Sequence, residues 1–447
     1  MAKRKKEKKI QDYNRAYAFL RHYVDAVLKL SYKRIRYIGT ENVPSDGAVI
    51  YAPNHANALM DALIILAMDQ KPKVFVARAD IFRNPFLAKA FKFLKIMPIM
   101  RMRDGINEVK KNNETIEKAV DVLKDKIPFC IFPEGQHLAK HSAQPLSKGI
   151  FRIAFQAKEL MPDVPLYIVP VGLQYGNFFR FRSTVRVQVG QAINIDEFMA
   201  ANAELTPQEQ MNVLKDDLSF RIKSLITYIP DDKNYQAVYE VCAAAMKGQR
   251  NAVLKSTEKK NKVRKLAHFQ ANKMLLDRIS EIQQNSPELW GKLVELGNEA
   301  YKERTLKRIS LSSVTNRFGF VSRRLGFLFN LLLLPYSLVA SILTLPLVLL
   351  CKLAFRLLKD FAFRNSVRFL VNLVVWPLLL VIYSAVAFSF LPWEIALAAV
   401  LLFLPSPIMV HEMWRMFRLE ISDWKLASNK KLKGLYREIN NLLFCRV

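Results

Sequence analysis

Short apolar runs alternate with stretches of helical periodicity between residues 39 and 200. The apolar runs are rich in branched and aromatic side chains, which predicts strands at Ala48–Ala52, Lys73–Ala77, Pro128–Phe132, Leu166–Val171 and Val185–Val189. Apolar residues at helical spacing predict intervening helices at Ala58–Met68, Pro85–Phe93, Glu108–Asp125 and Gly149–Glu159. This alternation is typical of a sheet covered by helices, so we expect an α/β domain over residues 39–200.

The segments on either side of this domain are polar and helical. Residues 1–38 begin with a basic run and continue with apolar residues at helical spacing, including Phe19, Tyr23 and Val27, which predicts a basic N-terminal helix. Such a helix can pack on the following domain, or it can lie on an anionic membrane with its aromatic side chains inward. Residues 201–320 show a helical pattern without a strand signal, so we expect a helical polar region there.

Residues 321–411 form the predicted membrane region. They hold three long apolar segments, at Leu325–Cys351, Phe369–Leu391 and Trp393–Val410, and each approaches the ~20 residues needed to cross a bilayer. The flanks of these segments, including the tail over residues 412–447, are rich in Lys and Arg, which favours the cytoplasmic side. A re-entrant first segment, broken at a proline and followed by one spanning hairpin, satisfies this rule better than three full crossings.

The charge of the chain indicates a polyanionic partner. Lys and Arg number 68 against 39 Asp and Glu, a formal net charge of +29. Because the chain also carries intramembrane segments, we expect anionic lipid headgroups as partners rather than nucleic acid. No zinc-finger spacing or aromatic RNA-binding motif supports a nucleic-acid partner. We therefore expect an integral membrane protein whose α/β domain lies in the cytoplasm, with its four cysteines reduced.

The first candidate for chemistry is Asn54-His55, followed by Asp61, at the end of the first predicted strand. A histidine can accept a proton at neutral pH, and a nearby carboxylate can fix its tautomer and stabilise the imidazolium. Taken alone, a histidine beside a strand end is more often structural. Three further segments change this interpretation.

These segments also lie at predicted strand ends or helix starts. Pro98-Ile99-Met100-Arg101 ends in a guanidinium that can bind a phosphate bidentately. Phe132-Pro133-Glu134-Gly135 places a carboxylate and a permissive glycine after a strand, and Lys148 precedes a helix start suited to an anion. Val169-Pro170-Val171 carries a proline inside a strand, which predicts an edge strand or a wall of the substrate site.

Together and in this order, these blocks resemble the glycerolipid acyltransferase family, which contains the lysophosphatidate and glycerol-3-phosphate acyltransferases. The resemblance covers about residues 37–195. It implies an α/β acyltransferase domain, followed here by the helical region and the C-terminal membrane region. It also implies transfer of a fatty acyl group from acyl-CoA or acyl carrier protein, as co-substrate, to the hydroxyl of glycerol-3-phosphate or 1-acylglycerol-3-phosphate in phospholipid biosynthesis.

The resemblance implies a role for each site residue. His55 is the general base and Asp61 orients it. Arg101 binds the acceptor phosphate, and the remaining substrate-binding residues are Asn54, Glu134, Gly135 and Lys148. No cofactor is implied. His137 and His141 are spaced like metal ligands, but no third ligand is evident, so no metal is expected.

Two departures from the family pattern stand out. Five residues separate His55 from Asp61, where four are usual, and this longer spacing resembles the fungal glycerol-3-phosphate acyltransferase branch. The extra residue must be accommodated in the loop around Ala56 and Asn57, because an added helical residue turns a side chain by ~100°. Gln136-His137 replaces the usual Thr-Arg or Thr-Ser, which leaves open an acceptor that is another lysophospholipid or a lyso-aminolipid. A non-catalytic lipid-binding scaffold is a further alternative.

Overall fold

The computed structural model describes residues 9–99, 112–255, 260–315, 320–358 and 360–444. The chain forms two compact units. The first comprises residues 1–226 and 350–378, and the second comprises residues 227–349 and 379–447.

The first unit is built on a mixed sheet, which confirms the predicted fold class. In the described residues its strands are β1 (Tyr32–Ile38), β2 (Ala48–Pro53), β3 (Val74–Arg78), β4 (Ile96–Ile99), β5 (Phe129–Cys130), β6 (Leu166–Tyr175), β7 (Ser183–Val189) and β8 (Ile193–Asn194). Their order is β1-β7-β6-β2-β5-β3-β4, with β8 paired to β6. All pairings are parallel except those of β6 with β7 and β8. The ends of β2 and β5 therefore meet at one edge, where the predicted chemistry lies.

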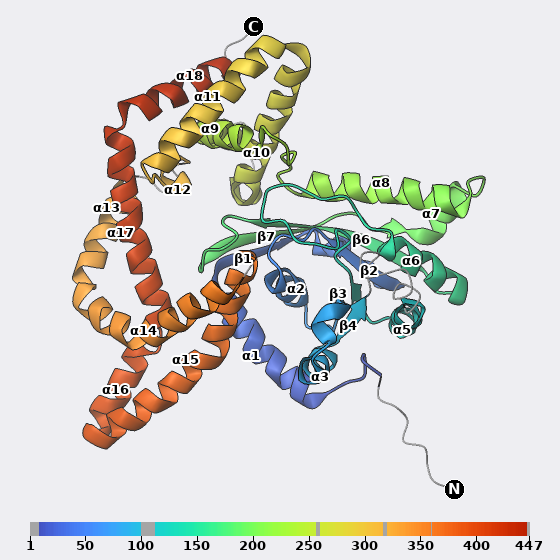
Figure 1. Cartoon of the computed structure of the whole chain (residues 1–447), viewed down its shortest axis with the longest axis horizontal. Coiled ribbons are helices and arrows are strands. Elements are labelled where there is room, and N and C mark those ends of the chain that lie inside the picture. The colour runs from blue at the N-terminus through green and yellow to red at the C-terminus, as the bar shows by residue number, and fades with distance from the viewer. Residues whose placement is uncertain (1–8, 100–111, 256–259, 316–319, 359, 445–447) are drawn as a thin grey trace. The chain divides into compact units, whose positions relative to one another are not determined.

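Helices cover both faces of this sheet, as Figure 1 shows with α8 on one side and α1 and α2 on the other. These helices are α1 (Arg15–Ser31), α2 (Leu59–Leu66), α3 (Pro85–Phe93), α5 (Asn112–Lys124), α6 (Gly149–Leu160), α7 (Ile195–Ala201) and α8 (Pro207–Leu225). Alternate residues of β2 point to opposite faces. Ile50 packs in a core with α5, α6 and α8, whereas Tyr51 packs in a second core with α1 and α2.

The α/β unit extends beyond the boundaries predicted for it at residues 39 and 200. The strand β1 lies within residues 1–38 and pairs with β7. Helix α8 packs on the sheet through Leu214, Leu218 and Ile222, all fully buried. This helix looked like part of the polar region because only a narrow apolar stripe, repeated every fourth residue, interrupts its charged and amide side chains.

The prediction of an edge strand at Pro170 is wrong, because β6 lies between β7 and β2. Pro170 pairs with Ala52 of β2 on one side. On the other side of β6, the neighbouring strand changes from β8 to β7 at Pro170. Strand β8 pairs with β6 up to Ile168, and β7 pairs with it from Val171 onwards. The missing proline N–H thus falls in a gap between two partners, where it breaks no ladder hydrogen bond.

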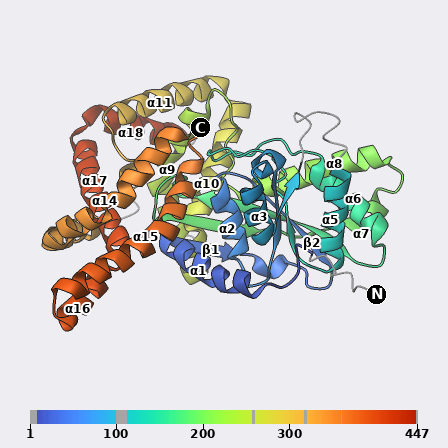
Figure 2. The ribbon, with the colours of Figure 1, turned by 60° about the horizontal axis from the view of Figure 1, so that its bottom comes forward.

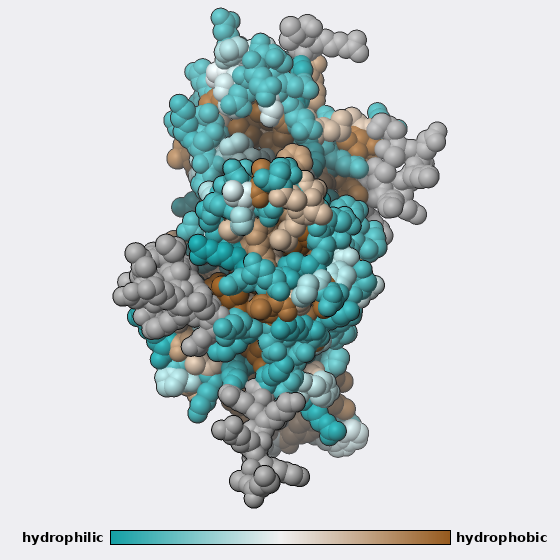
Figure 3. Space-filling model, turned by 90° about the vertical axis from the view of Figure 1, so that its right-hand side faces the viewer, coloured by the Kyte–Doolittle hydropathy of each residue, from teal (hydrophilic) through white to brown (hydrophobic). Residues whose placement is uncertain are grey.

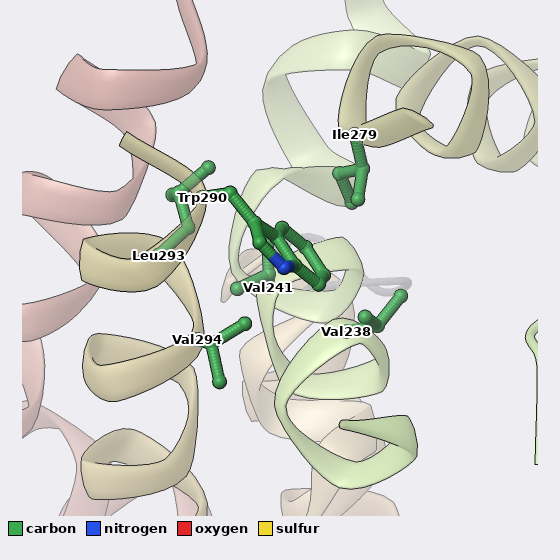
Figure 4. A pocket seen from close by; sticks show the side chains of 6 residues that line it. All are labelled: Val238, Val241, Ile279, Trp290, Leu293 and Val294. Atoms are coloured by element: carbon green, nitrogen blue, oxygen red, sulfur yellow. The ribbon is translucent and has the colours of Figure 1, made fainter. Parts of the chain in front are cut away.

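The second unit contains the helices α9 (Tyr235–Lys255), α10 (Lys260–Asn285), α11 (Pro287–Leu306) and α18 (Lys430–Phe444), packed on a common apolar core. Fully buried Glu240 accepts hydrogen bonds from Arg304 Nε at 2.8 Å and from the Tyr436 hydroxyl at 2.5 Å. Figure 4 shows a small pocket in this unit, with an empty volume of about 180 Å³ that includes open solvent, lined by Val238, Val241, Ile279, Trp290, Leu293 and Val294. None of these side chains is titratable, so the pocket offers no acid–base group.

Five further helices occupy the predicted membrane region: α13 (Phe320–Leu332), α14 (Leu334–Leu357), α15 (Phe363–Phe390), α16 (Trp393–Phe403) and α17 (Ser406–Ser428). In the described residues α14 and α15 are each long and apolar enough to cross a membrane, and the pair α16 and α17, bent by 48°, would make a third span if counted as one. The first predicted segment breaks at Leu333, before Pro335, whereas Pro346 lies inside α14. The number of crossings remains a prediction.

Apolar side chains are not spread evenly over the surface. Figure 3 views the side that carries α7 and α8 in Figure 1, where hydrophilic side chains cover most of the surface and apolar ones form smaller patches. The candidate spans instead expose large apolar residues, among them Ile342, Leu353, Val381 and Ile382. Exposure of this kind fits a lipid environment rather than water.

Candidate active site

His55 directly follows the carboxyl end of strand β2, and hydrogen bonds of Asn54 fix the backbone at this point. The Asn54 backbone N–H donates to the Val171 carbonyl at 3.2 Å. Its side chain accepts from the Leu173 N–H at 2.6 Å and donates to the Leu173 carbonyl at 3.2 Å. Asn54 is only 3% exposed and its amide is bonded to the main chain. These bonds let Asn54 position the backbone before His55, and its contact with substrate stays a prediction.

His55 and Asp61 are in direct contact. The Nδ1 atom of His55 lies 2.8 Å from Oδ2 of Asp61, whose side chain is fully buried. The same Oδ2 accepts the backbone N–H groups of Ala56 at 2.7 Å and Asn57 at 2.6 Å. Because Asp61 acts here as an acceptor, the proton of neutral His55 belongs on Nδ1, which leaves Nε2 as the basic nitrogen.

The loop accommodates the longer spacing between these two residues. Helix α2 begins only at Leu59, after Ala58, whose backbone adopts φ +44° and ψ −127°. A positive φ is unusual for alanine and turns the chain sharply, so that residues 56 and 57 wrap around the Asp61 carboxylate. Asn57 is the other polar side chain in this loop, and it donates to the Phe178 carbonyl at 2.7 Å. The partner of the His55 imidazole is therefore Asp61 and not Asn57.

A tyrosine that the sequence pattern did not identify completes the carboxylate's surroundings. The Tyr175 hydroxyl, at the end of β6, donates to Oδ1 of Asp61 at 2.5 Å. Tyr175 is 1% exposed, and burial raises its pKa well above the usual value, so it remains a hydrogen-bond donor. Tyr175 could have been suspected only from its position at the end of β6, the strand that pairs with β2, which leads into His55.

The ring of His55 is held by its neighbours. It stacks on Phe132, with ring centroids 4.2 Å apart, and the His137 ring meets it edge-on at 5.5 Å. The Leu138 N–H donates to the His55 carbonyl at 3.0 Å. Stacking and main-chain bonds together restrict the rotation of a side chain that is 17% exposed.

The Glu134 carboxyl group links the loop that carries His55 to the loop that carries Gln144. One oxygen accepts the His55 N–H at 3.2 Å, and the other accepts the Gln144 N–H at 3.3 Å. Burial raises the pKa of Glu134 to about 8, even though both N–H donors act to lower it. The carboxyl group is therefore largely protonated at neutral pH, and its contact with the acceptor stays a prediction.

This raised pKa predicts a pH-dependent stability. The folded chain keeps a proton that the unfolded chain loses above pH 4.5, so the free energy of unfolding should fall as pH rises towards 8. Relative to Glu134→Gln, we expect a loss of about 2 kcal/mol between pH 6 and pH 8. Denaturant unfolding of both proteins across this range measures the difference. Parallel stability curves would show that Glu134 is already ionised at pH 6.

The remaining predicted residues differ in how the structure places them. Gly135 adopts φ +66° and donates to the Phe132 carbonyl at 3.1 Å, and a β-carbon there would meet no protein atom within 4 Å. The positive φ favours glycine, and its contact with the acceptor stays a prediction. Lys148 is exposed directly before α6. Arg101 lies outside the described residues.

The two candidate metal-binding histidines have other partners. His137 Nε2 lies 2.7 Å from Oδ2 of Asp360, and the His141 ring packs against Phe178. Within the ranges that the structure describes, no group of three or more His, Cys, Asp or Glu residues is arranged to hold a metal ion.

Residues 34–174 match the acyltransferase family model, and this range contains the His55 site described above except Tyr175, Phe178 and Asp360. These residues therefore form an acyltransferase-family domain. The match is in keeping with the resemblance seen in the sequence blocks.

Two curated relatives give the comparison more detail. Glycerol-3-phosphate O-acyltransferase 2 of Saccharomyces cerevisiae is 27% identical over 149 residues, which cover 32% of this chain and 20% of the yeast protein. The 1-acyl-sn-glycerol-3-phosphate acyltransferase of Borreliella burgdorferi is 25% identical over 152 residues, which cover 34% of this chain and 58% of that protein. The chain thus spans between a fifth and somewhat over half the length of these relatives.

A solved structure is also similar, that of the 1-acyl-sn-glycerophosphate acyltransferase of Thermotoga maritima. The sequences are 19% identical, the TM-score is 0.33, and the match covers 47% of this chain and 83% of that one.

Proposed function

We propose that this chain transfers a fatty acyl group from an acyl thioester to the hydroxyl of glycerol-3-phosphate or 1-acylglycerol-3-phosphate. The observation that carries the proposal is the 2.8 Å contact between His55 and buried Asp61 inside an acyltransferase-family domain. The names of the two curated relatives, which specify these two acceptors, support the choice of substrate.

The geometry supports direct transfer. Nε2 of His55 takes the proton of the acceptor hydroxyl as its oxygen attacks the thioester carbonyl carbon. The tetrahedral intermediate then collapses, the carbon–sulfur bond breaks, and the departing thiolate recovers the proton from the imidazolium. Asp61 stabilises the imidazolium between these steps, as carboxylates do in related dyads. No covalent acyl-enzyme is needed.

The protein must supply more than a base. General-base catalysis contributes about 10²–10⁴-fold, so the remaining acceleration has to come from holding the hydroxyl and the thioester together. The fixed loop at residues 54–57 and the stacked His55 ring are suited to that task because neither has to reorganise when the substrates bind.

We propose that the reaction takes place at the cytoplasmic face of a membrane. The candidate spans α14 and α15 support membrane insertion, and the net charge of +29 supports contact with anionic headgroups. An enzyme held in this way releases its lipid product where that product partitions.

Arg101 provides a test of acceptor binding. If its guanidinium binds the acceptor phosphate, Arg101→Ala should raise the KM of the acceptor about 10–100-fold and leave that of the thioester nearly unchanged. Initial rates with each substrate varied in turn measure the two constants. A larger rise in the thioester KM would assign Arg101 to the donor site instead.

A panel of acceptors tests the proposal as a whole. Membranes containing the full chain are given labelled acyl-CoA or labelled acyl carrier protein, together with glycerol-3-phosphate, lysophosphatidate, other lysophospholipids or a lyso-aminolipid. We expect labelled product with one of the first two acceptors. Product only with the others would move the activity to a different acceptor class, and no product with any of them would favour a non-catalytic lipid-binding scaffold.

A further inference from the structure

A chain of buried polar contacts joins the start of α15 to the Asp61 carboxylate. Asn365, in the first turn of α15, donates from Nδ2 to the Tyr32 hydroxyl at 3.1 Å. The Tyr32 and Tyr175 rings pack together with centroids 6.3 Å apart, so that their hydroxyl groups interact, and Tyr175 donates to Asp61. All four side chains are at most 5% exposed. We call Asn365, Tyr32, Tyr175 and Asp61 the buried relay.

A second contact joins the residues just before α15 to His137, which lies beside the His55 ring. Asp360 holds Nε2 of His137 at 2.7 Å, and its other oxygen accepts the Ala362 N–H at 2.8 Å just before α15 begins. The His137 ring meets Phe363 edge-on at 5.2 Å as well as His55. One short segment, residues 360–365, therefore contacts the surroundings of both members of the His55–Asp61 pair.

Apolar packing alone does not require these contacts. Phe369 of α15 already packs in the core shared by α1 and α2, and Figure 2 shows the start of α15 beside α1 and β1. Burying an amide costs free energy unless its partners are present. Asn365 meets this cost with two acceptors, Tyr32 and the Phe178 carbonyl, and Asn57 of the catalytic loop donates to the same carbonyl. These hydrogen bonds of Asn365 suit a role in holding Tyr32 and the loop of Asn57 in place beside Asp61.

We propose that residues 360–365 are a positioning element for the His55–Asp61 pair, through which the seating of the start of α15 sets the rate of acyl transfer. The inference rests on the proposed function. Asn365 and Asp360 touch no reacting atom in this account. They act through the buried relay and through His137.

The buried relay predicts the direction in which the pH dependence of kcat/KM changes when the relay is cut. The titratable groups around the His55–Asp61 pair are Glu134, His137, Tyr32, Tyr175 and Cys130. Hydrogen bonds in a chain polarise one another, so loss of the Tyr32 hydroxyl weakens the donation from Tyr175 to Asp61. More of the carboxylate charge is then available to His55, which stabilises the imidazolium. The acidic limb of the kcat/KM profile should therefore move to higher pH.

Five variants of the full chain in lipid nanodiscs test the inference. Asn365→Ala, Tyr32→Phe and their double variant cut the relay, and Asp360→Asn removes the charged partner of His137. Ser366→Ala is the matched control, because its buried hydroxyl has no hydrogen-bond partner in the part of the chain that the structure describes. Thermal unfolding of each variant establishes that folded protein is being compared.

We expect each relay variant to lower kcat about fivefold, with KM nearly unchanged and the acidic limb moved to higher pH. The double variant should be no worse than the poorer single one, since both cut the same chain of contacts. Asp360→Asn should also lower kcat, and Ser366→Ala should match the wild type. A fall in kcat that is additive, leaves the acidic limb in place, or is shared by Ser366→Ala would overturn the inference.

His55→Ala separates this outcome from failure of the proposed function. If acyl transfer by the pair is wrong, His55→Ala retains full turnover whatever the relay variants do. If only the positioning role is wrong, His55→Ala abolishes turnover while Asn365→Ala and Tyr32→Phe behave like Ser366→Ala.

Discussion

Replacing His55 with alanine should lower the turnover number for acyl transfer by about 10²–10⁴-fold. The reason is that Nε2 of His55 is the nitrogen that Asp61 leaves unbonded, and the carboxylate of Asp61 that would stabilise the imidazolium is fully buried. KM values for both substrates should change little, since the ring takes a proton rather than anchoring either one. Initial rates of thiol release and of product formation measure the effect.

An exposed histidine provides the matched control for this variant. His22 is exposed on α1, and His22→Ala should turn over like the wild type. Equal turnover of His55→Ala and His22→Ala would remove His55 from the mechanism. A loss of turnover accompanied by loss of the folded protein would instead show that His55 is structural.

Replacing Asp61 with asparagine should have an effect of similar size on turnover, about 10²–10⁴-fold, together with a loss of stability. Every contact of the Asp61 side chain is with a donor: His55 Nδ1, two backbone N–H groups and the Tyr175 hydroxyl. An asparagine amide must turn its own N–H₂ group towards one of these donors, and it cannot neutralise the imidazolium. The buried mismatch should cost about 1–3 kcal/mol of unfolding free energy.

Steady-state kinetics and denaturant unfolding of Asp61→Asn measure the two effects separately. Asp163→Asn, at an exposed loop position, is the control for the substitution itself and should change neither quantity. A variant that loses stability but keeps its turnover would limit Asp61 to shaping the loop at residues 54–57.

The elements that carry the site could be predicted because their signals are local. The apolar run at residues 48–52 matches β2, and the helical pattern at residues 85–93 matches α3. The extra residue between His55 and Asp61 could likewise be assigned to the loop, since a helix would have turned Asp61 away. The positive φ of Ala58 that achieves this could not be foreseen, because alanine rarely adopts it.

The partners of the site could not be predicted because they come from distant parts of the sequence. Tyr175 lies 114 residues from Asp61, and Asp360 lies 223 residues from His137. The residue type of Asn54 likewise does not reveal that the neighbouring strand occupies its amide. Residues 207–225 were expected to be helical, but the packing of α8 on the sheet was not foreseen, since only the sheet beneath it explains its apolar stripe.

Formation of an acylated glycerol phosphate by purified protein is the most direct test of the central claim, that His55 activates a glycerol-phosphate hydroxyl to attack an acyl thioester. Wild type and His55→Ala are incubated with labelled acyl-CoA or labelled acyl carrier protein, with and without glycerol-3-phosphate or lysophosphatidate, and products are identified by mass spectrometry. We expect wild type to form labelled ester with one of these acceptors, thiol release to require that acceptor, and His55→Ala to form almost no ester. Labelled ester formed equally by His55→Ala, or no ester from wild type with either acceptor, would contradict the central claim.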